Sequence, residues 1–187
     1  DRPVSGLVVF AKTSKALSRL NEMFRNGEVK KTYWAIVKQQ PKEAEGELVH
    51  YLVRNEKQNK SYAYDKEVKN SKKAVLNYRL IGHSENYYLL EVDLKTGRHH
   101  QIRVQFAHAG FPLLGDTKYG TAALKEVMPA QKYRGVALCA YSLELVHPIS
   151  GKKMGFRVVP KNPAFAGFAM EELKKLTENE TGISKRG

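Results

Sequence analysis

The sequence has a single cysteine, Cys139, among its 187 residues. One cysteine excludes an intramolecular disulfide and a cysteine metal cluster, so we expect a buried thiol in a protein of the reducing cytoplasm. The sequence also lacks any run of about 18 apolar residues, and its first residues are charged rather than apolar. We therefore expect neither a membrane span nor a signal peptide in these residues.

Acidic residues are scarce relative to basic ones: 19 aspartates and glutamates face 32 lysines and arginines, which gives a net charge of +13. This balance favours a polyanionic partner such as nucleic acid, and a basic surface that only confers solubility is the alternative. Ten tyrosines and seven phenylalanines could stack on unpaired bases or could simply fill the core. The 42% of hydrophobic residues fits one globular domain.

Apolar runs and their spacing predict the following elements. Residues 6–12 form a continuous apolar run typical of a buried strand, and Thr13 can cap a helix that Gly27 ends. A second helix is expected from Thr96-Gly97 to Gly110, carrying Arg98, His100, Gln101 and Arg103. Strands are expected at residues 29–37, 48–53, 61–68, 74–81 and 87–94, a hairpin at 136–146 and 153–159, and a last helix beyond Pro163. This order predicts an α+β fold with a mixed, mainly antiparallel central sheet flanked by helices, and residues 1–187 as a single domain.

Three sequence motifs, in this order, carry a resemblance to a known family. They are Asp1-Arg2-Pro3-Val4-Ser5-Gly6 before an apolar run, Lys31-Thr32-Tyr33-Trp34-Ala35, and Gly97-Arg98-His99-His100-Gln101-Ile102-Arg103, followed by Gly115-Asp116 and Tyr119-Gly120. The chain resembles the pseudouridine synthases of the RluA type, which isomerise uridines in RNA. Family members carry further residues before the aspartate, so we expect this chain to be a catalytic domain without its upstream part.

The resemblance implies the roles of several residues. It identifies Asp1 as the catalytic aspartate, Arg103 as its ion-pair partner, and Tyr33 as the ring that packs on the target base. It also brings Arg2, Lys31, Arg98, His100 and Gln101 near the RNA, although some of these could be structural. The implied activity needs no cofactor and no metal, and we expect a monomer that acts on RNA, with large-subunit ribosomal RNA favoured over transfer RNA.

The residue types are chemically suited to such a reaction. Breaking the bond from ribose to N1 and rejoining the base through C5 can use a carboxylate as nucleophile or base at the sugar, and Asp1 is that candidate. A solvated loop acid, a strand aromatic and a phosphate-binding arginine are the plainer interpretations of Asp1, Tyr33 and Arg103. A noncatalytic RNA-binding module and a hydrolase that cleaves the glycosidic bond are the rival functions.

A metal site is a further possibility, because His99, His100 and His108 lie close together in the sequence. On a helix the first two side chains would point about 100° apart, and no suitable acid or cysteine cluster accompanies them. We therefore expect no metal to be bound there.

Overall fold

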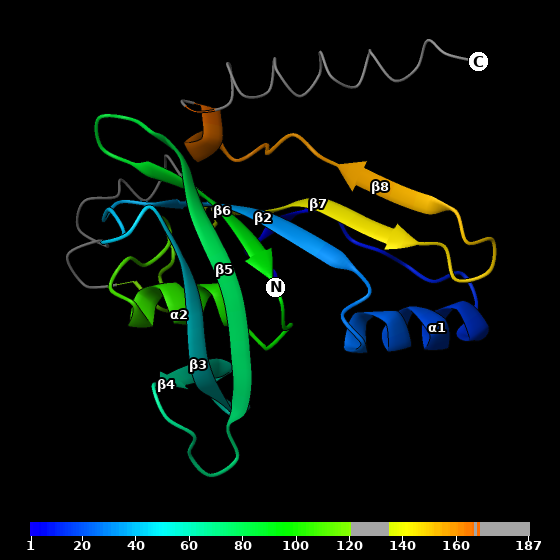
Figure 1. The fold of residues 1–187 in the computed structure, drawn as a ribbon. Coiled ribbons are helices and arrows are strands. Elements are labelled where there is room, and N and C mark those ends of the chain that lie inside the picture. Colours follow the sequence, from blue (N-terminus) through cyan, green and yellow to red (C-terminus); the bar gives the residue numbers. More distant parts are fainter. Residues whose placement is uncertain (121–134, 167, 169–187) are drawn as a thin grey trace.

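A computed structural model describes residues 1–120, 135–166 and 168, and shows one sheet with two helices on one of its faces (Figure 1). Neighbouring strands follow the order β1-β7-β2-β6-β5-β3-β4, and β8 also pairs with β7. Among the strand pairs of these described residues, only β1–β7 is parallel, so the predicted mixed, mainly antiparallel α+β class is confirmed. The elements are β1 (Ser5–Gly6), α1 (Ser14–Arg25), β2 (Lys30–Val37), β3 (Glu45–Asn55), β4 (Lys60–Tyr64), β5 (Lys72–His83), β6 (Tyr88–Leu94), α2 (Gln101–His108), β7 (Leu138–Val146) and β8 (Lys153–Arg157).

The central strand β2 divides its side chains between two cores. Ala35 and Val37 face the core beneath α2, whereas Trp34 and Ile36 face a second core that contains Phe165. Alternate residues of a strand point to opposite faces, so a strand that is buried on both faces needs the continuous apolar run found here. Burial on both faces makes β2 a rigid base for Tyr33.

Helix α1 begins and ends where its sequence predicts. The side chain of Thr13 accepts a hydrogen bond from the Ala16 amide at 3.1 Å, as expected of an N-cap, and Gly27 follows the helix with φ +73°. Met23 is buried with Val29 and Leu143 in a small third core. The helix is therefore anchored near the β2–β7 end of the sheet.

Helix α2 is shorter than predicted. It begins at Gln101, so Arg98 and His100 precede it, and His100 has a left-handed backbone with φ 54°. Ile102 and Phe106 pack into the main core on the predicted face. The displaced start changes the directions of His99 and His100, whose rings stack with centroids 3.7 Å apart instead of pointing apart on a helix.

The predicted buried strand at residues 6–12 is wrong beyond Gly6. Strand β1 ends there, and Val8 and Phe10 are 71% and 85% exposed. The reason lies in β7, because Cys139 and Ala140 pair with β1 while Ser142 to Val146 pair with β8 on the same edge. Residues 7–12 therefore cannot continue β1 along β7, whatever their hydrophobicity.

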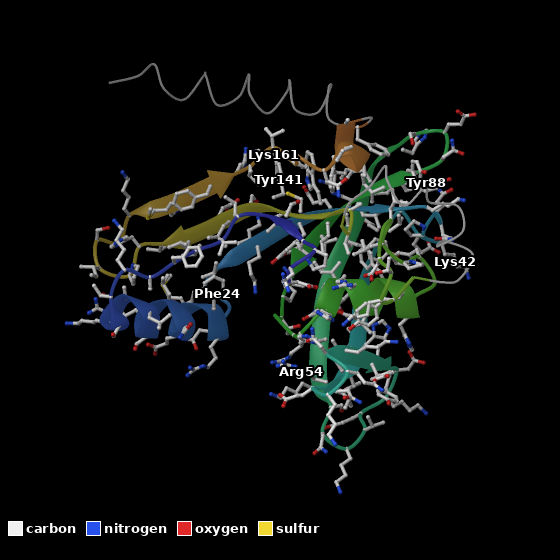
Figure 2. All side chains as sticks on the ribbon, turned by 180° about the vertical axis from the view of Figure 1, so that it is seen from behind. Phe24, Lys42, Arg54, Tyr88, Tyr141 and Lys161 are labelled. Carbon is white, nitrogen blue, oxygen red and sulfur yellow. The ribbon has the colours of Figure 1, made fainter. Side chains whose placement is uncertain are left out.

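Strand β7 contains an irregularity beside Tyr33. Thr32 of β2 pairs with Ser142 and Tyr33 pairs with Ala140, so the register shifts by one residue and Tyr141 is the extra residue of a β-bulge. Tyr141 stacks on Trp34 at a centroid distance of 4.1 Å, on the side of the sheet away from α1 (Figure 2). The odd-numbered residues of β7 consequently contact two cores, with Cys139 and Tyr141 on one face and Leu143 and Leu145 on the other.

The remaining predictions concern the ends of the chain. The hairpin of β7 and β8 is confirmed, and Cys139 is buried at 1% exposure. The last helix was predicted beyond Pro163: a short 3-10 helix spans Pro163–Phe165, and residues from 169 onward lie outside the described part of the chain. The helices described here are all too short or too polar to cross a membrane.

Candidate active site

Arg103 joins two carboxylates that come from distant parts of the sequence. Its Nη1 atom donates to Asp1 Oδ2 at 2.7 Å, while Nε and Nη2 donate to the two oxygens of Asp116 at 2.7 and 2.8 Å. Arg103 is 4% exposed and Asp116 is 5% exposed. A planar guanidinium suits this forked geometry, in which one cation serves two anions. The ion pair of Asp1 with Arg103 that the resemblance implied is therefore present, and it has a second carboxylate behind it.

Asp1 reaches this position through the short strand β1. The Val136 amide donates to Pro3 O and the Leu7 amide donates to Ala140 O, which fixes the segment on both sides of β1 along β7. Gly6 has φ +116°, and a Cβ atom there would lie 2.4 Å from Ala140 O. Only glycine allows this approach, so the Ser5-Gly6 pair of the motif has a structural reason: it brings Asp1 to the face of the sheet.

The turn after α2 holds Asp116 in place. Asp116 Oδ1 accepts hydrogen bonds from the amides of Lys118 and Tyr119 at 3.0 and 3.1 Å, and the Gly120 amide donates to Asp116 O. In the sequence, Gly115-Asp116 and Tyr119-Gly120 stand out only as part of the family pattern, which implies no role for them. The spacing of these residues suits a turn around a carboxylate, and it is the one sequence signal for this contact.

His100 is the second group beside Asp1. Its Nε2 atom lies 3.4 Å from Asp1 Oδ2 and its Nδ1 atom lies 2.7 Å from the hydroxyl of Tyr119. Burial of the ring, together with the nearby His99, Arg103 and Lys118, lowers the pKa of His100 to about 4. The imidazole is therefore neutral at physiological pH, and the structure gives it internal partners rather than an outward, phosphate-facing position.

A cavity of about 780 Å³ opens in front of these groups. Tyr33, Val4, Leu94, Ile102 and Leu138 supply its apolar lining, and Asp1 lies in its wall. Burial raises the pKa of Tyr33, so its phenol keeps its proton well beyond neutral pH. A cavity with apolar walls and a few convergent polar groups is typical of a site for a small planar ligand such as a base.

Basic residues surround the mouth of this cavity: Arg2, Arg54, Arg98 and Lys118 are among its lining residues. Arg54 lies on the projecting β3–β4 hairpin, on the same side of the sheet as Phe24 of α1 (Figure 2). Arg98 donates from Nε to Lys73 O at 3.0 Å and is otherwise exposed. These positive charges suit a polyanion that crosses the mouth of the cavity.

Two other predicted RNA contacts have partners within the protein. The Gln101 amide is 3% exposed, accepts from Thr96 Oγ1 and the Arg98 amide, and donates to Val75 O. Lys31 is half-buried, which lowers its pKa, and its ammonium group lies 5.8 Å from the centre of the Phe24 ring. An RNA contact by Gln101 would require its internal hydrogen bonds to break, whereas Lys31 could turn outward at a smaller cost.

One group of three potential metal ligands, His50, Asp65 and His108, occurs in the described part of the chain, and it differs from the group of His99, His100 and His108 that the sequence analysis considered and rejected. Gln105 argues against a metal there. Its Nε2 atom faces Leu48 O, Ala74 O and His50 Nδ1 at 3.0–3.3 Å, so His50 Nδ1 is an acceptor and the ring proton sits on Nε2. A ligating histidine needs the opposite arrangement, with its second nitrogen donating, so the geometry suits a hydrogen-bonded cluster better than a metal centre.

Comparisons with known proteins identify the family of this chain. A profile of the RNA pseudouridylate synthase family matches residues 1–108. The tRNA pseudouridine synthase C of Vibrio cholerae is 33% identical over 172 residues, which cover 84% of this chain and 68% of that protein. The ribosomal large subunit pseudouridine synthase D of Zymomonas mobilis is 35% identical over 158 residues, covering 83% of this chain and 49% of that protein. The chain thus spans about half the length of some curated relatives that it matches.

Solved structures share the fold. Human RNA pseudouridylate synthase domain containing 4 superposes with a TM-score of 0.67 at 24% identity, over 91% of this chain and 72% of that one. Human RNA pseudouridylate synthase domain containing 1 gives a TM-score of 0.66 at 21% identity, over 80% and 62%. At these identities the likeness concerns the fold alone.

Proposed function

Because this chain belongs to the RNA pseudouridylate synthase family, we propose that it carries the active site of an enzyme that isomerises uridine to pseudouridine in RNA. The observation that carries the proposal is the Asp1 carboxylate, which Arg103 holds at 2.7 Å in the wall of an apolar cavity beside Tyr33. An RNA-binding module has no need of this arrangement.

The proposed reaction requires no co-reactant, because substrate and product are isomers. The bond from C1′ to N1 breaks, the base turns within the cavity, a bond from C1′ to C5 forms, C5 loses its proton and N1 gains one. Asp1 supplies the carboxylate, as nucleophile or as base. Arg103 is already neutralised by Asp116, so its role toward Asp1 is to fix the direction of the carboxylate rather than to cancel an isolated charge.

Tyr33 is proposed to pack on the uracil ring. It lies on the doubly buried strand β2, next to the extra residue of β7, and its ring faces the cavity. A stacked aromatic ring holds a base that has left its helix, and an enzyme that works on the glycosidic bond must first unstack the base. We further propose that the Tyr33 hydroxyl assists removal of the C5 proton as a relay, in which its oxygen takes up that proton while its own proton passes on to solvent.

The RNA is proposed to cross the basic mouth of the cavity, with Arg2, Arg54, Arg98 and Lys118 at its phosphates. Large-subunit ribosomal RNA is the proposed substrate and transfer RNA the alternative, since the relatives include proteins named for each. We further propose that the protein acts in the cytoplasm as a monomer without metal or cofactor. Mapping pseudouridines in cells with and without the protein identifies the RNA.

The test compares Asp1→Asn with Asp65→Asn, a matched change at an exposed carboxylate, in the full-length protein. Single-turnover pseudouridine formation should fall on the order of 10³-fold in Asp1→Asn, because the amide keeps the shape but loses the charge, and RNA affinity should stay close to that of the parent. Asp65→Asn should match the parent in both assays.

Each alternative gives a different result. A noncatalytic module binds RNA but forms no pseudouridine in the parent protein. A hydrolase releases free uracil and lowers the mass of the RNA, whereas isomerisation leaves the mass unchanged. Activity in Asp1→Asn within a few-fold of the parent would remove Asp1 from the mechanism.

A further inference from the structure

We propose that Tyr119 is a positioning residue that fixes the tautomer of His100, so that His100 directs its Nε2–H at Asp1 Oδ2 and leaves Asp1 Oδ1 free to react. The significance for catalysis rests on the function proposed above for Asp1. The hydrogen-bond assignment itself stands on the geometry of three side chains and one backbone amide.

The donors and acceptors around His100 favour one tautomer. The Ser61 amide donates to the Tyr119 hydroxyl oxygen at 2.8 Å, and that oxygen lies 2.7 Å from His100 Nδ1. If the hydroxyl donates to Nδ1, the neutral ring carries its proton on Nε2, which faces Asp1 Oδ2 at 3.4 Å. The opposite tautomer would direct the lone pair of Nε2 at a carboxylate and leave the hydroxyl proton of Tyr119 without this acceptor.

A doubly protonated ring is disfavoured at the same place. Arg103 and Lys118 bring positive charge toward His100, and His99 stacks on its ring, while Asp1 and Asp116 are the acidic groups nearby. The side chain of His100 is only 6% exposed. Water therefore cannot stabilise an imidazolium there, and the neutral ring has to choose between its two tautomers.

Tyr119 is well placed to make that choice. Its amide donates to Asp116 Oδ1, the same carboxylate that binds Arg103, and its ring lies 5.2 Å from the Arg103 guanidinium carbon. One turn thus holds both groups that contact Asp1. Nη1 of Arg103 donates to Asp1 Oδ2, and Nε2 of His100 lies 3.4 Å from the same oxygen. No hydrogen bond to Asp1 Oδ1 is found within the described residues, so Oδ1 is the oxygen available to the ribose.

The backbone of His100 gives an independent indication that the side chain matters. A left-handed conformation, φ 54°, is uncommon outside glycine and costs about 1 kcal/mol or more. His100 occupies the N-cap position of α2, yet its side chain makes no capping hydrogen bond. A residue in a strained position that neither caps the helix nor faces solvent is most simply explained by the contact of its ring with Asp1.

The test reads the tautomer directly, by long-range ¹H–¹⁵N correlation of the histidine rings in the labelled protein at pH 7. In the parent, His100 Nδ1 should appear as an unprotonated nitrogen and Nε2 as a protonated one. Tyr119→Phe keeps the ring but removes the hydroxyl, and should shift His100 toward a mixture of the two tautomers. Tyr62 lies on the same strand as Ser61, and its exposed hydroxyl donates to Gln58. Tyr62→Phe should therefore leave the tautomer of His100 unchanged.

Two results would overturn the proposal: a proton on Nδ1 in the parent protein, or an unchanged tautomer in Tyr119→Phe. Neither reading depends on turnover, so the assignment can fail or succeed whether or not the protein forms pseudouridine. If the protein forms pseudouridine, the single-turnover rate of Tyr119→Phe should fall about tenfold, the equivalent of one lost hydrogen bond, with unchanged RNA affinity. A rate equal to that of the parent, with the tautomer altered, would remove Tyr119 from the reaction.

Discussion

The two ends of helix α2 each bring histidine and aspartate together, but they do so in opposite surroundings. At its start, Asp1 and Asp116 share Arg103, and the side chains of Arg103, Asp116 and His100 are 5%, 1% and 6% exposed. At its end, His108 contacts Asp65 at 2.8 Å, but the Asp65 side chain is 80% exposed. The first grouping is connected to the backbone through the turn at Asp116, whereas the second lies on the surface.

This difference shows which charged contacts the fold depends on. A charge removed from water must keep its partners, because the remaining charge is costly to leave unpaired. An exposed pair competes with solvent and contributes little. The start of α2 is therefore the candidate active site and also a buried ion-pair network on which stability depends. The exposed contact at the end of α2 should contribute little to activity or to stability.

The largest effect is expected for Asp116→Ala. Removing this carboxylate leaves the buried Arg103 guanidinium without its bidentate partner, and the free energy of unfolding should fall by about 3 kcal/mol or more. Asp65→Ala is the matched control and should leave the urea midpoint unchanged within error. Equal urea midpoints for the two variants would show that the buried grouping contributes no more to stability than the exposed one.

A smaller effect, on rate rather than stability, is expected for Arg103→Lys. Lysine keeps the charge but cannot bind Asp116 with two nitrogens and Asp1 with a third. The single-turnover rate should fall about 100-fold through loss of a charge-assisted hydrogen bond. If the lysine variant instead loses affinity and shows a shallower salt dependence at an unchanged rate, Arg103 acts on phosphate and not on Asp1.

Tyr33→Phe tests the cavity wall between these charged groups. No hydrogen bond from its hydroxyl is found in the described part of the chain, so the urea midpoint should stay close to that of the parent. The stacking surface also remains, and RNA affinity should change little. A drop in single-turnover rate of about tenfold would assign proton transfer to the hydroxyl, and a parental rate would limit Tyr33 to packing.

The smallest effect is a dependence of stability on pH. Burial, the largest cause in each case, lowers the pKa values of His50, His99 and His100, so the unfolded chain binds more protons than the folded one below about pH 6.5. Stability is then complete above pH 6.5 and falls as the pH drops toward 4. Between pH 7 and 6, His100 should contribute a loss of less than about 1 kcal/mol.

Urea midpoints from pH 8 to 5 measure this loss. His100→Asn, which tolerates the left-handed backbone, should flatten the acidic slope more than His108→Asn at the exposed end of the helix. Identical slopes in the two variants would contradict the difference in burial between the two ends.

Local patterns in the sequence predicted much of the fold. The helix capped by Thr13, the strand containing Tyr33 and the β7–β8 hairpin follow from spacing and caps within a few residues. The run at residues 7–12 failed because hydrophobicity does not tell which edge of a sheet is free, and β8 occupies the edge of β7 that this run would need.

The candidate site was predictable only in part. The motifs carried Asp1, Tyr33 and Arg103, and the contact of Asp1 with Arg103 is present, while their catalytic roles stay predictions. The roles of Asp116 and Tyr119 were not predicted. Asp116 contacts Arg103 across 13 residues and Tyr119 contacts His100 across 19 residues, and such contacts through a turn produce no repeating pattern in the sequence. His100 was expected on a helix and near RNA, since nothing in the pattern signals a left-handed residue before the first helical turn.

The register shift in β7 also marks a point where the length of the strand could change. Insertions and deletions inside strands are usually harmful, because a shift of one residue turns every following side chain to the wrong face. The register between β2 and β7 shifts by one residue at Tyr141, and pairing is regular on both sides of it. Loss of one residue here would keep each flanking side chain on its present face, one residue away from Ala140, the partner of Tyr33, and its main cost would be the ring that stacks on Trp34.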